Sequence, residues 1–326
     1  METASSAAPP GTPVVSIVTA AHNAATYLPE AVESVLQQTF PHFELVIVDD
    51  GSTDHTGDVA RSFAAADPRV RVISTPNGGQ AKARNLAIRS ARGGYIVLLD
   101  SDDLLAPEYL ASQLSVFDAH PDVAIVTPNA VNRGGGPMFD GKPVWPDTRG
   151  LQRLTLRDLI EHEDAMCIIS MFRRDVWQAT GGFDTALRRN EDYEFWLRAA
   201  VAGFPILRSL KPVAVYRRRD DSLSSDEPEM IRGVIHVLRQ IDALLENRRE
   251  ERALLRRQIV RFTRELPRAE LRRSLQHNDG AMAARVLRAL AVDRRSWLLG
   301  ACASLTRLWP QPLLWAYHLR RQLRRA

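Results

Sequence analysis

The sequence predicts an α/β protein with a helical region at its C-terminal end. Three observations support this prediction. Short runs of β-branched and apolar residues alternate with helical patterns up to about residue 225. Several of these runs end abruptly in acidic turns. After Glu229 glycine becomes scarce and apolar residues recur at helical spacing.

Charge is distributed unevenly along the 326 residues, whose formal net charge is +4. From Asp226 to the end there are 21 arginines, no lysine and 11 acids, an excess of ten positive charges, so the first 225 residues carry about six negative ones. A basic tail favours an anionic partner such as a phospholipid surface or nucleic acid. The alternative is an arginine-rich, solvated helix face.

Two further features concern the compartment. Residues 1–13 lack a basic start followed by an apolar core, so we expect a disordered lead-in and no signal peptide. Cys167 and Cys302 lie far apart in apolar surroundings. This spacing favours reduced thiols in a cytoplasm over a disulfide framework.

The first elements form a βαβ unit. Residues 14–20 are predicted as a buried strand, 27–38 as a helix and 43–48 as a second buried strand. That strand ends in an acidic turn, Asp49 to Asp54. An aspartate there can accept hydrogen bonds from a nucleobase imide or a ribose hydroxyl, although the same residues also suit an ordinary turn.

A third strand is predicted over residues 70–74 and a fourth over 95–99. Between them, the glycine loop 77–80 opens a helix containing Lys82 and Arg84, which suits a phosphate. The fourth strand runs directly into three acids, Asp100, Asp102 and Asp103.

Packed carboxylates repel one another, and a divalent cation bridging phosphate oxygens would supply the missing positive charge. The alternative is a cap for the helix expected over residues 107–120. Because the carboxyl ends of such strands lie at one sheet edge, the loops at 20–23, 49–54 and 100–103 should converge there.

The rest of the first domain has a less regular pattern. Strands are predicted over 123–126, 168–173 and 212–217, with a helix starting near Asp192. Residues 127–165 read as a long irregular segment facing an acceptor, where Trp145 either stacks on a sugar ring or anchors the loop.

Helices are expected from 229 to Pro267 and again from about 270. The stretch 296–319 is apolar but interrupted by Arg307, Pro310 and Pro312, which argues against a membrane span. Its tryptophans and flanking arginines suit an interfacial helix pair on anionic lipid, while burial against the first domain is the alternative.

Four motifs, in this order, resemble the nucleotide-sugar half of family 2 inverting glycosyltransferases: SIVTAAHN, VDDGSTD, GGQAKARN and LDSDD. The resemblance covers residues 14–225. It implies the GT-A fold, a Rossmann-like mixed sheet flanked by helices, and it leaves 226–326 as an arginine-rich, possible membrane-associating helical region.

The resemblance also implies roles for individual residues. Asp192 would be the general base, and Asp100 with Asp102 would form the metal-linked pair for Mn²⁺ or Mg²⁺. Arg219 stands where the family commonly has a histidine, and arginine can clamp a diphosphate but cannot ligate a cation. The implied donor-binding residues are Ala20, Asn23, Asp50 for the base, Arg84 near the phosphates, Asp100 and Arg219.

We therefore expect transfer of a hexosyl or N-acetylhexosaminyl group from a nucleoside diphosphate sugar, with UDP favoured, to a lipid-linked or polysaccharide acceptor. The expected location is cytoplasmic, with peripheral attachment at the inner face of the cell membrane. One alternative is a sugar-phosphate nucleotidyltransferase, but residues 20–23 offer neither glycine nor cation for its phosphate loop. The other is a non-catalytic nucleic-acid-binding or scaffold protein, which leaves the acid clusters unexplained, so no nucleic acid is expected as a partner.

Overall fold

The computed structural model describes residues 12–219, 222–293, 297–308 and 310–315. The chain divides into two compact units that meet between Arg218 and Arg219. The boundary predicted from composition, after residue 225, lies a few residues further along the chain.

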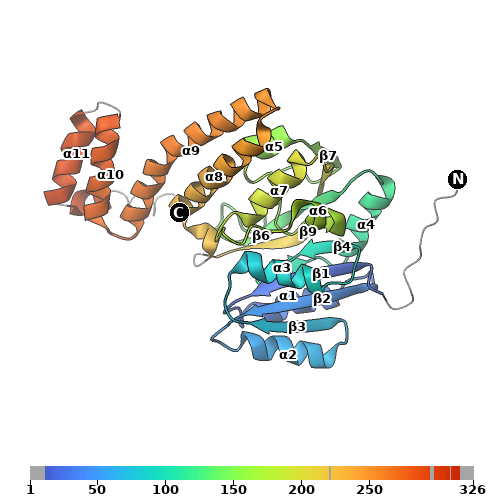
Figure 1. Ribbon diagram of the computed structural model, residues 1–326. Helices are drawn as coiled ribbons and strands as arrows, with labels where there is room; N and C mark the ends of the chain where they lie inside the picture. Colours follow the sequence, from blue (N-terminus) through green and yellow to red (C-terminus); the bar gives the residue numbers. More distant parts are fainter. Residues whose placement is uncertain (1–11, 220–221, 294–296, 309, 316–326) are drawn as a thin grey trace. The chain divides into compact units, whose positions relative to one another are not determined.

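Over the described residues, the N-terminal unit is built on one mixed sheet in the order β3-β2-β1-β4-β8-β6-β9-β5, with β7 paired to β9 (Figure 1). Strands β3, β2, β1 and β4 are parallel, and β8 runs antiparallel to its neighbours β4 and β6. The predicted α/β class and mixed sheet are confirmed. The strands are β1 (Val15–Ala21), β2 (Phe43–Asp50), β3 (Val70–Thr75), β4 (Tyr95–Leu98), β5 (Leu104–Leu105), β6 (Ile125–Gly134), β7 (Leu151–Leu154), β8 (Met171–Arg173) and β9 (Ile206–Arg218).

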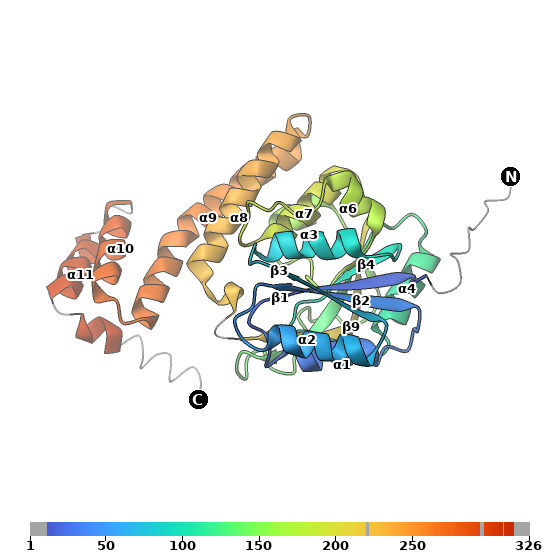
Figure 2. The ribbon, with the colours of Figure 1, turned by 60° about the horizontal axis from the view of Figure 1, so that its bottom comes forward.

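Helices cover both faces of this sheet: α1 and α2 lie on one side and α3, α6 and α7 on the other (Figure 2). The chain moves outward from β1 to β3 and then returns to pair β4 with β1, so the strand order reverses beside β1. Ligands of open α/β sheets bind outside the carboxyl ends of the strands at such a reversal. The helices are α1 (Leu28–Leu36), α2 (Thr56–Ala66), α3 (Gln80–Ser90), α4 (Tyr109–Ala119), α5 (Leu156–Glu161), α6 (Arg174–Thr180) and α7 (Glu191–Val201).

The central strands are as apolar as predicted. Every residue of β2 is buried, and β1 has one partly exposed residue, Ala20. Strand β2 extends two residues beyond the prediction, because Asp49 and Asp50 continue its ladder with Ser74 and Thr75 of β3. The acidic pair is therefore held by the sheet itself, which fixes the direction of its side chains.

The prediction of an irregular segment over 127–165 is wrong for much of its length. Strand β6 continues to Gly134 because it pairs with β9 throughout, with a register shift around Asn129, and β7 and α5 follow. The Asn129 side chain donates to the carbonyls of Trp145 and Asp147. The guanidinium of Arg208 lies 4.1 Å from the Trp145 ring centroid. These contacts support the anchoring role of Trp145.

An aromatic cluster fixes helix α7 against the sheet. The Phe195 ring centroid lies 4.6 Å from Phe183, 4.9 Å from Trp196 and 5.4 Å from Phe172, and Phe195 and Trp196 are fully buried. Buried aromatic pairs combine a large apolar area with a preferred ring geometry. The cluster therefore sets the position of the acidic first turn of α7.

A buried carboxylate, Glu44, organises the opposite, amino end of the strands. It accepts hydrogen bonds from the Ser16 hydroxyl at 2.7 Å, the Arg92 backbone amide at 2.6 Å and the Arg71 guanidinium at 3.1 Å. Burial alone would raise the pKa of Glu44, but these donors outweigh it and the pKa is lowered. The Glu44 carboxylate thus connects β1, β2 and the turn before β4 through hydrogen bonds.

We expect Glu44→Ala to lower the free energy of unfolding by roughly 1–3 kcal/mol at pH 7, because several donors lose their acceptor. A lowered folded-state pKa gives stability above the unfolded pKa of glutamate, about 4.3, that is lost as the pH falls. The difference measured by urea denaturation should therefore begin to shrink near pH 4 and continue to shrink as the pH falls towards the lowered pKa of folded Glu44. Glu33→Ala, at an exposed position of α1, is the control, and an equal loss there would contradict the assignment.

The C-terminal unit is helical over its described residues. Its elements are η1 (Leu223–Ser225), α8 (Glu227–Asp242), η2 (Ala243–Leu245), α9 (Arg249–Gln276), α10 (Gly280–Asp293) and α11 (Trp297–Leu308). The predicted break at Pro267 is wrong, because α9 continues through the proline. A proline removes one backbone hydrogen bond, and burial of Phe262 and Ala269 on either side holds the helix together. In the part of the chain that the structure describes, no helix is long and apolar enough to cross a membrane.

Candidate active site

The loops after β1 and β2 are bonded to each other at the carboxyl edge of the sheet. Asn23, in the left-handed region with φ 50°, accepts hydrogen bonds through its side-chain oxygen from the Thr53 amide at 2.8 Å and the Thr53 hydroxyl. The backbone amide of Asn23 donates to the Ser52 hydroxyl at 3.1 Å. The two loops therefore form one preorganised surface beside Ala20.

Asp50, predicted to hold the base of a nucleotide, fastens a third loop. Its two carboxylate oxygens accept hydrogen bonds from the amides of Gly78 and Gly79, each at 2.8 Å. A side chain at Gly51 would meet the Asn77 amide nitrogen at 2.4 Å, so only glycine allows this approach. The hydrogen bonds from Gly78 and Gly79 fix the position of the Asp50 carboxylate. Its contact with the nucleotide's base stays a prediction.

Arg84 is the centre of the acidic part of the site. Its side chain is only 3% exposed, and it donates to Asp100 and to Glu191 at 2.5 Å each. Gln80 donates to the same oxygen of Asp100 at 3.1 Å. Burial opposes the charge of Arg84, but the attraction of Asp100 and Glu191 outweighs it and raises the arginine pKa. The structure thus gives Arg84 two carboxylate partners, and its place near the donor phosphates stays a prediction.

Asp103 is the buried member of the 100–103 cluster. One of its oxygens accepts the backbone amide of Arg217 at 2.8 Å, and the other is buried without a partner among the described residues. Burial, and then the negative charges of Asp100 and Asp102, raise the pKa of Asp103 well above its usual value. The Arg217 guanidinium donates to the Asp102 carbonyl and to Glu30. The electrostatic potential is therefore negative at the carboxyl end of β4.

Asp192 stands in the first turn of α7, beside Glu191, and its side chain is half-buried. Burial raises its pKa, the positive charge of Arg84 acts against the rise, and Asp100 adds to it. A carboxylate with a raised pKa is a better proton acceptor near neutral pH. Asp192 thus combines partial exposure with proximity to the Asp100 side of the site.

The residues at 100–103 fit a divalent cation by their chemistry. Carboxylate oxygens suit Mg²⁺ and Mn²⁺, and one buried carboxylate oxygen of Asp103 has no hydrogen-bond partner among the described residues. The described residues contain no group of three or more His, Cys, Asp or Glu side chains arranged to hold a metal. A site of this kind would use one or two carboxylates, completed by phosphate oxygens and water.

Comparison with known proteins identifies the family. A family model described as glycosyl transferase family 2 matches residues 16–181, about half of the chain. The chain belongs to glycosyltransferase family 2. The putative teichuronic acid biosynthesis glycosyltransferase TuaG of Bacillus subtilis is 31% identical over 71% of this chain and 90% of its own length.

Longer relatives match this family 2 chain over only part of their length. Chondroitin synthase of Pasteurella multocida is 36% identical over 59% of this chain and 19% of its own, so the match spans about a fifth of that protein.

Solved structures show the GT-A fold. S. aureus TarS 1-349 in complex with UDP-GlcNAc superposes with a TM-score of 0.63 at 21% identity, covering 94% of this chain and 91% of that one. The mannosyltransferase PcManGT from Pyrobaculum calidifontis, in complex with GDP-Man and Mn²⁺, gives 0.55 at 20% identity, covering 96% and 87%.

The structure brings the predicted residues of this glycosyltransferase together in two groups. Ala20, Asn23 and Asp50 lie at the ends of β1 and β2, while Arg84 links Asp100 to the helix turn that carries Asp192. Asp102 follows β4 in the same loop as Asp100. Arg219 is the first residue of the C-terminal unit, where its carbonyl accepts hydrogen bonds from Ser222, and its role stays a prediction.

Three contributors were missed by sequence reasoning. The sequence places Glu191 beside Asp192 but does not predict that Glu191 shares Arg84 with Asp100. Arg217 fixes the loop of Asp102 and Asp103. Cys167 is buried near these acids. Burial is the main cause that raises the pKa of its thiol to about 12, and the negative charge of Asp103 adds to the rise. None of the three has a local signal except the position of Glu191 beside Asp192.

Proposed function

We propose that this protein is a metal-assisted, inverting glycosyltransferase that uses a UDP sugar. The observation that carries the proposal is the link from Asp100 through Arg84 to Glu191, which ties a donor-side acid to the helix turn of Asp192. The complex of TarS with UDP-GlcNAc supports a UDP donor. The names of TuaG and of chondroitin synthase support a polysaccharide acceptor, and a lipid-linked one stays a second prediction.

Asp192 performs the proton transfer in this proposal. Its carboxylate takes the proton of the acceptor hydroxyl while that oxygen bonds to the anomeric carbon. The bond from the anomeric carbon to the diphosphate breaks on the opposite face, and its electron pair leaves with the diphosphate, so the configuration inverts. Arg84 holds Asp100 and Glu191 in place during this step.

Asp100 and Asp102 would hold a divalent cation, Mn²⁺ or Mg²⁺. When bound, the cation neutralises charge on the departing diphosphate. The Mn²⁺ in the PcManGT complex supports this assignment. Arg219 would add a second positive group through bidentate contact with the diphosphate.

The proposal is tested by thermal shift with UDP-GlcNAc, UDP-glucose, UDP-glucuronate and GDP-mannose, each with and without Mn²⁺. A ligand at 100 times its Kd stabilises the folded state by about 2.7 kcal/mol, which is readily measured. We expect UDP sugars with Mn²⁺ to raise the melting temperature most. Stabilisation by a nucleoside triphosphate with a sugar phosphate, and by no nucleotide sugar, would instead support a nucleotidyltransferase.

A further inference from the structure

Helix α11 has an unusual burial pattern. It packs against α10, but the residues it buries are the small Ala303 and Thr306. Four large apolar side chains of the same helix are 57–84% exposed. A surface helix of a globular protein ordinarily buries its apolar side. The exposed residues are Trp297, Leu298, Leu305 and Leu308.

Large apolar side chains are also exposed outside α11. Val292, near the end of α10, is exposed, and so is Trp315 in the helical residues 311–315 that follow Pro310. Several large exposed apolar side chains in one short region are typical of a protein or membrane interaction site. Helix α11 has 12 residues and is too short to span a bilayer, so a membrane-bound arrangement would place it along the interface.

The positive charge of the C-terminal residues indicates the kind of partner that the α11 surface would contact. Residues 294–326 contain seven arginines and no acid, which disfavours pairing of this region with a second copy of itself. Each basic residue near an anionic leaflet adds to binding. Tryptophan and leucine on one face of a short helix, with arginines before and after it in the sequence, are typical of helices that lie in the headgroup region.

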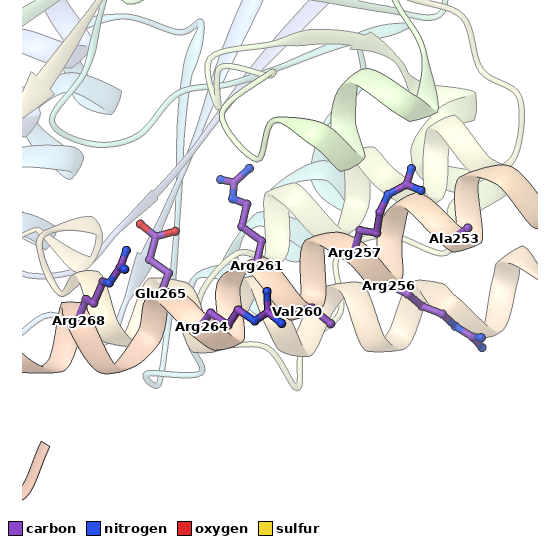
Figure 3. Close-up of a pocket in the computed structure, with 8 residues that line it drawn as sticks. All are labelled: Ala253, Arg256, Arg257, Val260, Arg261, Arg264, Glu265 and Arg268. Atoms are coloured by element: carbon purple, nitrogen blue, oxygen red, sulfur yellow. The ribbon is translucent and has the colours of Figure 1, made fainter. Parts of the chain in front are cut away.

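Helix α9 adds positive charge to the same unit. A groove of about 770 Å³ along this helix is lined by five arginines, with Glu265 the single acid among its lining residues (Figure 3). Arg257, Arg261, Arg264 and Arg268 are exposed and follow one another at helical spacing. Arg256 is bonded to Asp242. Such a charged surface steers a protein towards an anionic membrane.

We propose that the α11 surface, formed by Trp297, Leu298, Leu305 and Leu308, docks on an anionic phospholipid membrane. Aromatic and leucine side chains insert at the headgroup level, and the arginines contact the lipid phosphates. This proposal does not depend on the proposed reaction, because it rests only on residues of the C-terminal unit.

The test uses the full chain and vesicles of phosphatidylglycerol and phosphatidylcholine. We expect the wild type to co-sediment at low salt, to release at high salt because screening weakens charge contacts, and to bind pure phosphatidylcholine poorly. The double substitution Leu305→Ser with Leu308→Ser should lower partitioning of the protein onto the vesicles by about tenfold or more, because the transfer of two leucine side chains from water into the membrane no longer contributes to binding. Leu244→Ser, at an exposed leucine of η2, is the matched control and should bind like the wild type.

Folding and function are followed separately. Because both leucines are exposed, the double variant should keep its melting temperature and its nucleotide-induced thermal shift. Equal vesicle binding by the double variant and the wild type would overturn the proposal, and so would wild type that ignores anionic vesicles. Sedimentation of the wild type as a dimer that the double variant dissociates would assign the surface to a second copy instead.

Discussion

Asp192→Asn is expected to lower turnover by roughly 10² to 10⁴, the usual contribution of a positioned general base, while donor binding is retained. The amide keeps the size of the side chain but cannot accept the acceptor proton. The measurement is kcat on the true acceptor, beside the thermal shift with UDP sugar and Mn²⁺. Loss of turnover with an unchanged shift separates chemistry from binding.

The pH profile gives a second readout. Because burial raises the pKa of Asp192, the residue becomes protonated at a higher pH than an ordinary aspartate, whose pKa is about 3.9. Turnover by the wild type should therefore fall on the acidic side with an apparent pKa above that value. The Asn variant should lack this acidic limb.

Asp175→Asn is the matched control, because Asp175 is an exposed acid in the first turn of α6. An acid in that position interacts favourably with the helix dipole by about 0.3–1 kcal/mol. If Asp192 only stabilised the start of α7, both variants would lose similar stability and keep their turnover. That result would remove Asp192 from the chemistry.

Asp102→Asn should abolish the part of donor binding that depends on Mn²⁺, because the substitution removes a full negative charge from the proposed cation ligands. The Asp102 carbonyl, which accepts from Arg217, is retained, so folding should survive. The measurement is the melting temperature with UDP, with and without Mn²⁺. The wild type should show a shift that requires the metal, and the variant should not.

Asp118→Asn, at an exposed position of α4, controls for a general change in charge. It should keep the full Mn²⁺-dependent shift. An undiminished shift in Asp102→Asn would exclude Asp102 as a ligand. An equal loss in both variants would point to long-range electrostatics in place of coordination.

The sequence predicts those parts of the fold whose local pattern agrees with their final environment. The runs that became β1, β2 and β4 are apolar and β-branched, and the sheet buries them. The extension of β6 was missed because Pro128 and Asn129 are poor strand residues. Pairing with β9 overrides that local preference, and a partner more than 80 residues away leaves no local signal.

In the candidate site, too, features with a local sequence signal could be predicted and long-range contacts could not. The acids at strand ends could be predicted because each follows an apolar run directly. The partners of Arg84 could not, since Asp100 is 16 residues away and Glu191 is 107. Likewise, three neighbouring acids give no indication that Asp103 alone is buried. Only the three-dimensional packing decides which carboxylate meets which cation.

The position of Arg84 between two carboxylates has a thermodynamic consequence. Asp100 and Glu191 share one guanidinium through different nitrogens. A ligand that changes the charge at Asp100 therefore also changes the proton affinity of Glu191 and of its neighbour Asp192. Linkage is reciprocal, and protonation on the acceptor side must change donor affinity by the same factor.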